Sequence, residues 1–192
     1  MTDPLSLFDA WYQEARTSET SDPNAMAVAT ATRDAVPSVR MVLLKEHGPG
    51  GFVFYTNLGS RKGEELAANP RAALCFHWKS TYKQVRIEGP ITLVSDAEAD
   101  AYFASRERSK QLAAIASQQS RPLPSYDVLE DKVAALDAFH AETSPPRPAH
   151  WTGVRVIPDR FEFWEGTQDR MHHRRLLLAD GRGGWAETLL YP

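Results

Sequence analysis

The sequence predicts a strand-dominated α+β fold, in which a β-barrel carries helices packed on its outside. Three observations predict this fold. Five strand-like runs follow one another before residue 95, the segment 96–142 has helical periodicity, and four more strand-like runs occupy residues 150–192. Because the stretches between the early strands are short, we expect these strands to pair mostly antiparallel.

The N-terminal segment, residues 1–24, predicts a helix and a linker. In PLSLFDAWYQEA, Leu5, Phe8 and Trp11 recur at helical spacing, and Pro4 suits the first turn. The polar linker RTSETSDPN follows. Runs of apolar and β-branched residues then predict five strands, at 25–32, 36–45, 51–57, 71–78 and 83–94.

Three more helices are expected. One interrupts the early strands: it begins at Ser60, a favourable N-cap, and ends near Pro70. The helices 96–117 and 125–142 are separated by the breaker QQSRPLP, and the stiff connector SPPRP follows them. The last four strands are expected at 151–158, 160–166, 171–179 and 184–192. Since no internal repeat is present, we expect a single domain over residues 1–192.

Composition limits the classes of function. The net charge of −3 argues against a general binder of nucleic acid, so basic residues that matter should face one small anion. The single cysteine, Cys75, allows no disulfide within the chain and fits a reducing cytoplasm. We expect no signal peptide, because the acidic N-terminus has no basic region, and no membrane span, because no stretch approaches roughly 20 apolar residues.

The stretch FVFYTNLGSRKGEEL predicts an anion site. A strand ends, a glycine turn follows, and a helix begins at Ser60 with Arg61 and Lys62 in its first turn. Cations are normally disfavoured there, because a helix N-terminus is already positive. A bound phosphate would reverse this, since free N–H groups and two cations would converge on it. A solvated helix start is the alternative, and neither a GxGxxG nor a Walker motif is present.

Two further groups of cations are compatible either with a bound anion or with simple exposure to solvent. In RMVLLK, strand alternation puts Arg40 and Lys45 on opposite faces of an otherwise apolar strand, which we expect to be buried. Each cation then needs an anion or an exit to solvent. In YFASRERSKQ, Tyr102, Arg106 and Lys110 fall at i, i+4 and i+8 of an expected helix and share one stripe. That stripe suits either a second phosphate or a solvated helix face.

The stretch RMHHRR sits at the start of an expected strand. Alternation would put Arg170, His172 and Arg174 on one face and His173 on the other. Adjacent histidines on a strand do not readily chelate one metal, and no His or Cys cluster elsewhere has ligand spacing, so we expect no metal site. The Arg-His-Arg face suits an anionic or electron-rich ligand. Trp164, just upstream, would give an aromatic ligand a flat wall or belong to the core.

Taken together and in this order, these segments resemble the pyridoxine (pyridoxamine) 5′-phosphate oxidase family. The segments that carry the resemblance are RMVLLK, FYTNLGSRKG, KQVRIEG with its Gln84, YFASR, QQS, HWTGVRVIPDRFEFW and RMHHR. The resemblance runs from about residue 4 to residue 192. It implies a split β-barrel that binds FMN, and a homodimer with two FMN sites at the subunit interface.

The resemblance also implies site residues, position by position. FMN would be bound by Arg40, Met41, Val42, Leu43, Leu44, Lys45, Tyr55, Thr56, Arg61, Lys62, Gln84, Gln119, Ser120, Trp164 and Arg174. The substrate would be bound by Lys45, Tyr102, Arg106, Lys110, Arg170, Met171 and His172. Of these, Arg170 and His172 would be the catalytic pair against the substrate ring.

The implied activity is oxidation of pyridoxine 5′-phosphate and pyridoxamine 5′-phosphate to pyridoxal 5′-phosphate. Hydride would pass from C4′ of the substrate to N5 of the flavin, and molecular oxygen would reoxidise the flavin with release of hydrogen peroxide. Two alternatives stay open. One is a flavin oxidase of the same fold with another substrate, such as one in phenazine biosynthesis. The other is a carrier that binds FMN or pyridoxal phosphate without turnover.

Four positions depart from the pattern of the family. His173 stands where Asp is usual, Leu189 where Arg is usual, Lys110 where Ser is usual and Ala113 where Gly is usual. Lys110 keeps a group that can donate a hydrogen bond to a phosphate, and it adds a positive charge. We hypothesise that the missing Asp and Arg normally form an ion pair and were lost together, because losing one alone would leave an unpaired charge.

Overall fold

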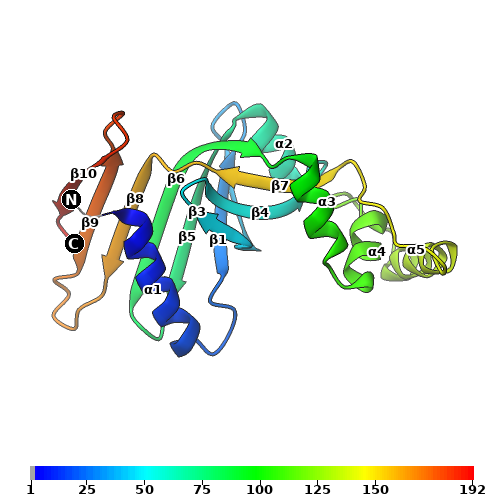
Figure 1. Ribbon diagram of the computed structural model, residues 1–192, viewed down its shortest axis with the longest axis horizontal. Helices are drawn as coiled ribbons and strands as arrows, with labels where there is room; N and C mark the ends of the chain where they lie inside the picture. Colours follow the sequence, from blue (N-terminus) through cyan, green and yellow to red (C-terminus); the bar gives the residue numbers. More distant parts are fainter. Residues whose placement is uncertain (1–2) are drawn as a thin grey trace.

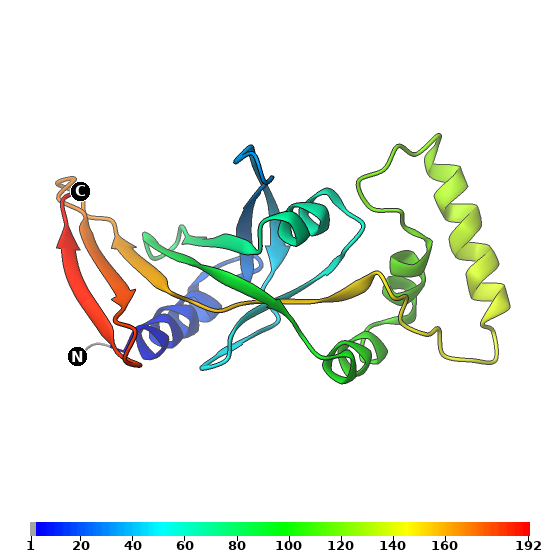
Figure 2. The same cartoon turned by 90° about the horizontal axis from the view of Figure 1, so that it is seen from above.

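The computed structural model describes residues 3–192, which form five helices and ten strands (Figures 1 and 2). The helices are α1 (Pro4–Ser18), α2 (Arg61–Ala68), α3 (Asp96–Ala104), α4 (Arg108–Ala116) and α5 (Tyr126–Phe139). The strands are β1 (Ala25–Ala31), β2 (Pro37–Leu43), β3 (Glu46–Gly48), β4 (Gly51–Asn57), β5 (Arg71–Trp78), β6 (Lys83–Leu93), β7 (Trp151–Val156), β8 (Arg160–Glu165), β9 (His173–Ala179) and β10 (Trp185–Leu190). No helix within residues 3–192 is long and apolar enough to cross a membrane.

The strands form one curled antiparallel sheet, which confirms the predicted strand-dominated α+β fold (Figure 1). Its main path runs β10-β9-β8-β6-β5-β1-β2. The long strand β6 also carries the rest of the sheet: its first part pairs with β5 and β8, and its last residues, 91–93, pair with β7. From β7 the sheet continues through β4 to β3.

Strand β6 changes partners at Gly89, and this is where the sheet curls. A Cβ at Gly89 would lie 1.8 Å from the carbonyl oxygen of Ile157, so only glycine allows β6 and the segment after β7 to pass this closely. On either side of the crossing, Asp159 N donates to Glu88 O and Ile157 N donates to Pro90 O, both at 2.9 Å. The crossing therefore directs β7 and β8 to different parts of β6.

Helix α1 covers one face of the sheet (Figure 1). Asp3 caps it by accepting two backbone N–H bonds, and proline occupies the first turn as predicted. Phe8 is fully buried, and its ring centroid lies 4.9 Å from that of Phe52 and 5.2 Å from that of Phe76. Burying a side chain of this size stabilises the fold by about 1.5–3 kcal/mol, so Phe8 anchors the helix to the barrel.

The prediction of one continuous helix over residues 96–117 is wrong, because the chain turns at Ser105 between α3 and α4. The Ser105 hydroxyl donates to the carbonyl of Tyr102 at 2.8 Å, and the side-chain Nε2 of Gln111 donates to the carbonyl of Phe103 at 2.8 Å. These bonds satisfy the last carbonyls of α3, so the helix ends there. Tyr102, Arg106 and Lys110 therefore do not form a stripe along one helix, although all three line one cavity.

Strand β2 lies at an edge of the sheet, and the prediction that it is buried is wrong. Its side chains alternate between partly buried and exposed, and Val39 and Met41 are 67% and 64% exposed. Farther along the chain, α3, α4 and α5 extend beyond one end of the barrel, while the β9–β10 hairpin lies at the opposite end (Figure 2). The elements near β2 and those near β9 are thus far apart within one chain.

Candidate functional site

A cavity of about 1110 Å³ lies between β2, the start of α2 and the helices α3 and α4. Its wall contains one carboxylate, Glu107, and a set of cationic side chains, although the whole chain is acidic. The cationic side chains are Arg40, Lys45, Arg61, Lys62, Arg106 and Lys110. Such a concentration of positive charge in a concave site favours an anionic ligand.

The start of α2 has the features expected of a phosphate site. Ser60 caps the helix, as predicted, and accepts a hydrogen bond from Gly63 N at 3.3 Å. Lys62 is only 8% exposed, and its Nζ donates to Thr56 Oγ1 at 3.1 Å and to Gln119 Oε1 at 2.8 Å. Burial, reinforced by the charge of Arg40, lowers the pKa of Lys62. A buried ammonium with neutral acceptors would gain from an anion.

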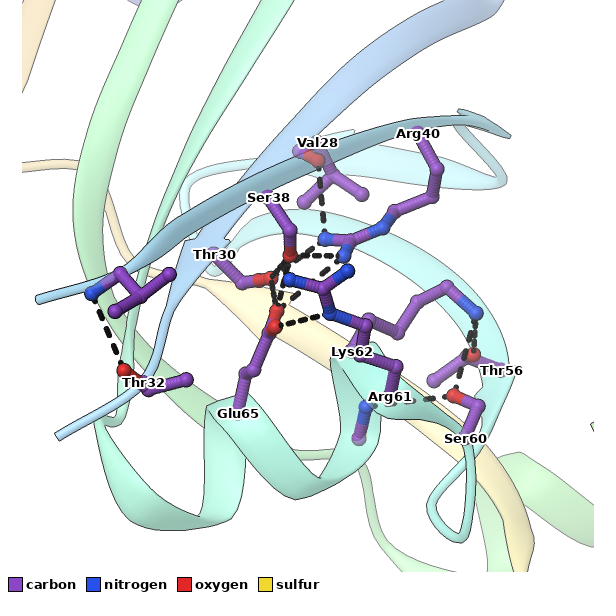
Figure 3. A network of polar contacts seen from close by, with 12 residues as sticks. Val28, Thr30, Thr32, Ser38, Arg40, Thr56, Ser60, Arg61, Lys62 and Glu65 are labelled. Carbon is purple, nitrogen blue, oxygen red and sulfur yellow. Dashed lines mark hydrogen bonds and ion pairs between the residues drawn. The ribbon is translucent and has the colours of Figure 1, made fainter. Parts of the chain in front are cut away.

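A buried carboxylate lies beside this site (Figure 3). Glu65 is 4% exposed and accepts hydrogen bonds from Thr30, from Ser38 at 2.5 Å, from Arg61 at 2.9 Å and from Arg40 at 3.3 Å. Burial opposes ionisation of Glu65, but these hydrogen bonds outweigh it and lower its pKa to about 2. The carboxylate therefore stays charged and holds two cations of the cavity wall in place.

A second cationic group lies at the α3–α4 end of the cavity. The rings of Tyr55, Tyr102 and Trp151 stack nearly parallel, with centroids 4.0 Å apart for Tyr55 and Tyr102. The guanidinium carbon of Arg106 lies 4.9 Å from the centroid of the Trp151 ring. Burial lowers the pKa of Arg106, and its Nη1 is buried without a hydrogen-bond partner among residues 3–192. Such a donor fits an anion supplied by a ligand.

The remaining residues predicted around these two groups lie in the same cavity, with one exception. Lys110, which departs from the family pattern, lines the cavity and lies 3.0 Å from Glu107. Lys45, Gln119 and Ser120 also contribute to the wall. The exception is Leu44, whose side chain belongs to the hydrophobic core. The other cavity-lining residues predicted from the sequence are Met41, Val42, Leu43 and Thr56.

Gln84, Trp164 and Arg174 form a row on another part of the sheet. Gln84 pairs with Trp164 across β6 and β8, and Trp164 pairs with Arg174 across β8 and β9. Residues directly opposite on neighbouring strands face the same side, so their side chains share one face. Arg174 donates to the buried carboxylate of Glu162 at 2.6 and 3.0 Å, which fixes its guanidinium on this face.

The predicted catalytic pair lies in the loop before β9, and the prediction that it belongs to the strand is wrong. Strand β9 begins at His173, and Arg170 has φ of 62°, in the left-handed region that no strand residue adopts. The ring of His172 lies 4.8 Å from that of Trp164, and its Nδ1 accepts a hydrogen bond from Thr167 N at 3.1 Å. Tertiary contact, rather than strand alternation, thus joins His172 to the row of Gln84, Trp164 and Arg174.

His173 and Leu189, two departures from the family pattern, line a smaller cavity of about 410 Å³ between α1 and the C-terminal strands. His173 pairs with Glu165, whose carboxylate lies 3.9 Å from Nδ1, and Leu189 pairs with Arg175. Neither position touches the cationic cavity. Within residues 3–192, no three His, Cys, Asp or Glu side chains are grouped as metal ligands would be.

The predicted residues therefore form two sets in one chain. The cavity set brings together the segments RMVLLK, FYTNLGSRK, YFASRERSK and QQS. The sheet-face set contains Gln84, Trp164, Arg174 and His172, and it does not line that cavity. Sequence reasoning missed the buried carboxylates that hold the arginines. Glu65 lies four residues after Arg61, a helical spacing that predicts such a contact, but nothing local marks Glu162.

Comparison with known proteins identifies the family. Residues 13–140 match the family model described as Pyridoxamine 5′-phosphate oxidase, and residues 151–192 match the one described as Pyridoxine 5′-phosphate oxidase C-terminal dimerisation region. The pyridoxine/pyridoxamine 5′-phosphate oxidase of Novosphingobium aromaticivorans is 62% identical over 190 residues, which cover 99% of this chain and 94% of that protein. The protein of the same name from Zymomonas mobilis is 56% identical over 191 residues, covering 99% and 98%.

The solved structures agree with this assignment. The structure of PhzG from Burkholderia lata, in complex with tetrahydrophenazine-1-carboxylic acid, superposes with a TM-score of 0.94 at 31% identity, covering 100% of this chain and 94% of that one. A pyridoxamine 5′-phosphate oxidase-related, FMN-binding protein of Nostoc punctiforme superposes with a TM-score of 0.75 at 17% identity, a similarity that concerns the fold alone. By sequence and by fold, this chain belongs to the pyridoxamine 5′-phosphate oxidase family.

Proposed function

We propose that this chain catalyses the FMN-dependent oxidation of pyridoxine 5′-phosphate and pyridoxamine 5′-phosphate by molecular oxygen, giving pyridoxal 5′-phosphate and hydrogen peroxide. One observation carries the proposal: a single cavity holds two separate cationic groups, one at the start of α2 and one at the α3–α4 turn. Flavin mononucleotide and the substrate each carry one phosphate. Two anion subsites in one cavity match that pair of ligands.

The subsite at α2 fits the phosphate of FMN. Arg61 and Lys62 would bind it together with the free N–H groups of the helix start, and Gln119 and Ser120 would close the site from the neighbouring loop. The fit rests on Lys62, a buried cation whose acceptors are neutral oxygens of Thr56, Ser60 and Gln119. A phosphate would supply the missing negative charge.

The subsite at the α3–α4 turn fits the phosphate of the substrate. The buried Nη1 of Arg106 supports this, since it has no partner among the described residues. Tyr102, Lys45 and Lys110 would add donors around it. Arg106 is also fixed against the face of Trp151, so its donors are oriented before a ligand binds.

A second copy of the chain would complete the site. The sheet-face set with Gln84, Trp164 and Arg174 lies away from the cavity in one chain, and the match of residues 151–192 to a dimerisation region supports a homodimer. Exposed apolar side chains of β2 beside the cavity, Val39 and Met41, would be buried by a partner. We propose that FMN lies at this interface, between the cavity of one copy and the sheet face of the other.

The chain would supply positioning and hydrogen bonding around the reacting groups. When bound, FMN supplies the two-electron redox chemistry that the side chains of the chain lack. Arg170 and His172 would orient the substrate ring. Because Nδ1 of His172 accepts from the backbone N–H of Thr167, its neutral ring carries the proton on Nε2 and presents a donor there. We therefore assign His172 a role in orienting the substrate by donating a hydrogen bond.

The test is a spectroscopic one. The purified protein should be yellow with bound flavin, and pyridoxine 5′-phosphate added without oxygen should bleach the flavin absorbance. This bleaching should yield one pyridoxal 5′-phosphate per flavin reduced, and admission of air should then restore the colour and produce one peroxide per flavin reoxidised. A yellow protein whose flavin stays oxidised with both B6 phosphates would contradict the proposal and favour either a flavin oxidase with another substrate or a carrier.

An oxidase of the phenazine type is the second candidate, because PhzG superposes over the whole chain. Its identity of 31% is half that of the Novosphingobium oxidase at 62%. The same anaerobic experiment separates the two candidates. Bleaching by a reduced phenazine carboxylate, without bleaching by pyridoxine 5′-phosphate, would identify the phenazine type.

A further inference from the structure

Glu65 lies at the centre of a network that joins two cations of the cavity (Figure 3). Its two carboxylate oxygens divide the work. Oε1 accepts from Nε of Arg61 at 2.9 Å, and Oε2 accepts from Arg40, Ser38 and Thr30. The carboxylate thus connects β1, β2 and α2 at the edge of the proposed phosphate subsite.

Arg61 binds Glu65 in a way that leaves the two Nη groups of its guanidinium available for another ligand. The bond uses Nε, so the two Nη groups are not taken up by the carboxylate, and the side chain is 61% exposed. An unrestrained arginine on a helix surface samples many rotamers, and binding an anion requires one of them. The bond to Glu65 removes part of that freedom before the anion arrives.

Arg40 is held from several sides at once. Its Nη1 donates to Thr30 Oγ1 at 2.5 Å and to the Val28 carbonyl at 3.3 Å, while its Nη2 donates to Ser38 Oγ at 2.5 Å and to Glu65 at 3.3 Å. The two hydroxyls that contact Arg40 also donate to Glu65. Glu65 is therefore the acceptor on which this whole arrangement depends.

A carboxylate beside a phosphate subsite has two opposing effects. Its charge repels the anion, which weakens binding. Its hydrogen bonds fix the arginines, which strengthens binding. The geometry favours the second effect, because Glu65 faces the two arginines and two hydroxyls, and four donors absorb its charge.

We propose that Glu65 is a positioning residue for the phosphate subsite, which holds Arg61 with its Nη groups available for the phosphate of FMN and fixes the positive charge of Arg40 beside it. This inference rests on the proposed function. Glutamine cannot replace Glu65, because its amide has one oxygen. If that oxygen faces Arg61, the NH2 group opposes the N–H of Arg40, and the reverse orientation opposes Arg61. Either orientation releases one arginine.

The experiment compares FMN with riboflavin, which lacks the phosphate, by flavin fluorescence titration of the apoprotein. For Glu65→Gln we expect the dissociation constant of FMN to rise about tenfold or more, as for loss of a charge-assisted hydrogen bond, while that of riboflavin stays within about twofold. Glu64→Gln is the matched control. It lies on the same helix, pairs with Arg121 and is 54% exposed, and it should leave both constants unchanged.

Ser38→Ala separates positioning from charge and replaces Glu65→Gln if that variant fails to fold. It keeps the carboxylate and both arginines but removes the hydroxyl that joins Glu65 to Arg40. We expect FMN affinity to fall in the same direction, by a smaller factor. Tighter FMN binding by Glu65→Gln, with no effect of Ser38→Ala, would show that Glu65 acts only by repulsion and overturn the inference. Equal weakening of FMN and riboflavin would also overturn it, as a general structural defect.

The wild-type protein distinguishes this inference from the proposed function. If wild type binds FMN no more tightly than riboflavin, the phosphate subsite itself is wrong and the proposed function fails with it. If wild type prefers FMN and Glu65→Gln keeps the full preference, the inference alone fails.

Discussion

Lys62 and Gln119 are joined by a hydrogen bond of 2.8 Å from Nζ to Oε1, although 57 positions separate them in the chain. Lys62 lies in the first turn of α2, and Gln119 lies in the loop after α4. The bond closes one side of the cationic cavity around a buried ammonium. An anion that binds the helix start would therefore meet an ammonium that an acceptor from the loop after α4 holds in place.

Replacing this ammonium should weaken phosphate binding specifically. For Lys62→Met we expect the dissociation constant of FMN to rise about 10- to 100-fold, because a hydrogen bond to a charged group contributes about 1.5–3 kcal/mol. Riboflavin binding should change little. Lys132→Met, on α5, is the control, since it lies on the exposed far helix. A parallel loss of riboflavin binding would contradict a role in phosphate recognition.

The affinity of the wild-type protein for FMN should also depend on alkaline pH. Burial, with the charge of Arg40, lowers the pKa of Lys62 below its ordinary value of 10.5. Only the protonated amine attracts a phosphate dianion, so affinity should be full at neutral pH and fall as pH rises through the lowered pKa. Titrations between pH 7 and pH 10 measure this fall. Lys62→Met should bind FMN weakly, with the same affinity at every pH in this range. If the affinity of this variant for FMN still fell with pH, the pH dependence would not come from Lys62.

Arg106 should affect the substrate and leave the cofactor bound. For Arg106→Lys we expect KM for pyridoxine 5′-phosphate to rise about tenfold or more, because lysine lacks the fork that recognises phosphate and the stacking on Trp151. FMN affinity should remain within about twofold. Steady-state kinetics and flavin titration measure the two effects. Arg182→Lys, in the exposed turn before β10, makes the same substitution as a control. If FMN affinity falls in parallel, the two anion subsites are one.

Glu65 should stabilise the folded chain in a defined range of pH. Its folded-state pKa is lowered from 4.5 to about 2. Its contribution to the free energy of unfolding is therefore complete above about pH 4.5 and is lost as pH falls towards 2. Thermal unfolding should be followed between pH 6 and pH 2.5. The melting temperature of the wild type should lie well above that of Glu65→Gln at pH 6, and the difference between the two should shrink as the pH falls. The melting temperature of Glu64→Gln should change with pH as that of the wild type does. A difference between wild type and Glu65→Gln that grows in acid would contradict a lowered pKa of Glu65.

The two departures at the C-terminal strands should be energetically coupled. Asp at position 173 alone would face Glu165, and Arg at position 189 alone would face Arg175, so each single change places like charges opposite. Together, the new Asp and Arg would lie on one face and attract. In a double-mutant cycle of His173→Asp and Leu189→Arg, we expect a coupling of at least about 0.5 kcal/mol in the free energy of unfolding. Additive effects would refute the hypothesis that the residues were lost as a pair.

Charge on the edge strand β2 should separate the subunits. Met41 is 64% exposed, in a strand beside the cavity. For Met41→Glu we expect sedimentation to show a larger fraction of monomer and a loss of FMN binding, because a buried charge at an interface is costly. Arg33→Glu, in the turn before β2, is the control. An unchanged dimer that keeps FMN would place the interface elsewhere.

Local sequence patterns predicted most of the elements and the cationic start of α2. The N-cap at Ser60 and the two cations of the first turn depend on residues adjacent in the chain, and they lie where the pattern predicts. The nine predicted strands are also present, but β3 (Glu46–Gly48) was not predicted and β2 ends at Leu43 rather than at residue 45. The family resemblance extended this to Gln84 and Arg174, and the structure puts both on one sheet face. Whether these residues bind FMN stays a prediction.

Local patterns failed where hydrogen bonds within a turn decide the backbone conformation. The helix over 96–117 breaks at Ser105 because Gln111 folds back on the carbonyls of α3, and periodicity gives no sign of that bond. Strand β9 starts only at His173, because a turn precedes it in which Arg170 has a positive φ, Arg170 N donates to Thr167 O and Met171 N donates to Asp169 Oδ1. In both places, the competing hydrogen bonds outweigh the intrinsic preference of the segment.

The sequence by itself determined the family and the class of fold, and it predicted an anion site at SRKGEEL, because these follow from residue type and local spacing. Only the tertiary structure decided which charges meet. Buried Glu65 lies between Arg61 and Arg40, Glu162 holds Arg174, and the candidate site residues separate into a cavity and a distant sheet face. The reason is physical: the free energy of a buried charge depends on every group that surrounds it, and those groups come from strands and helices far apart in the chain.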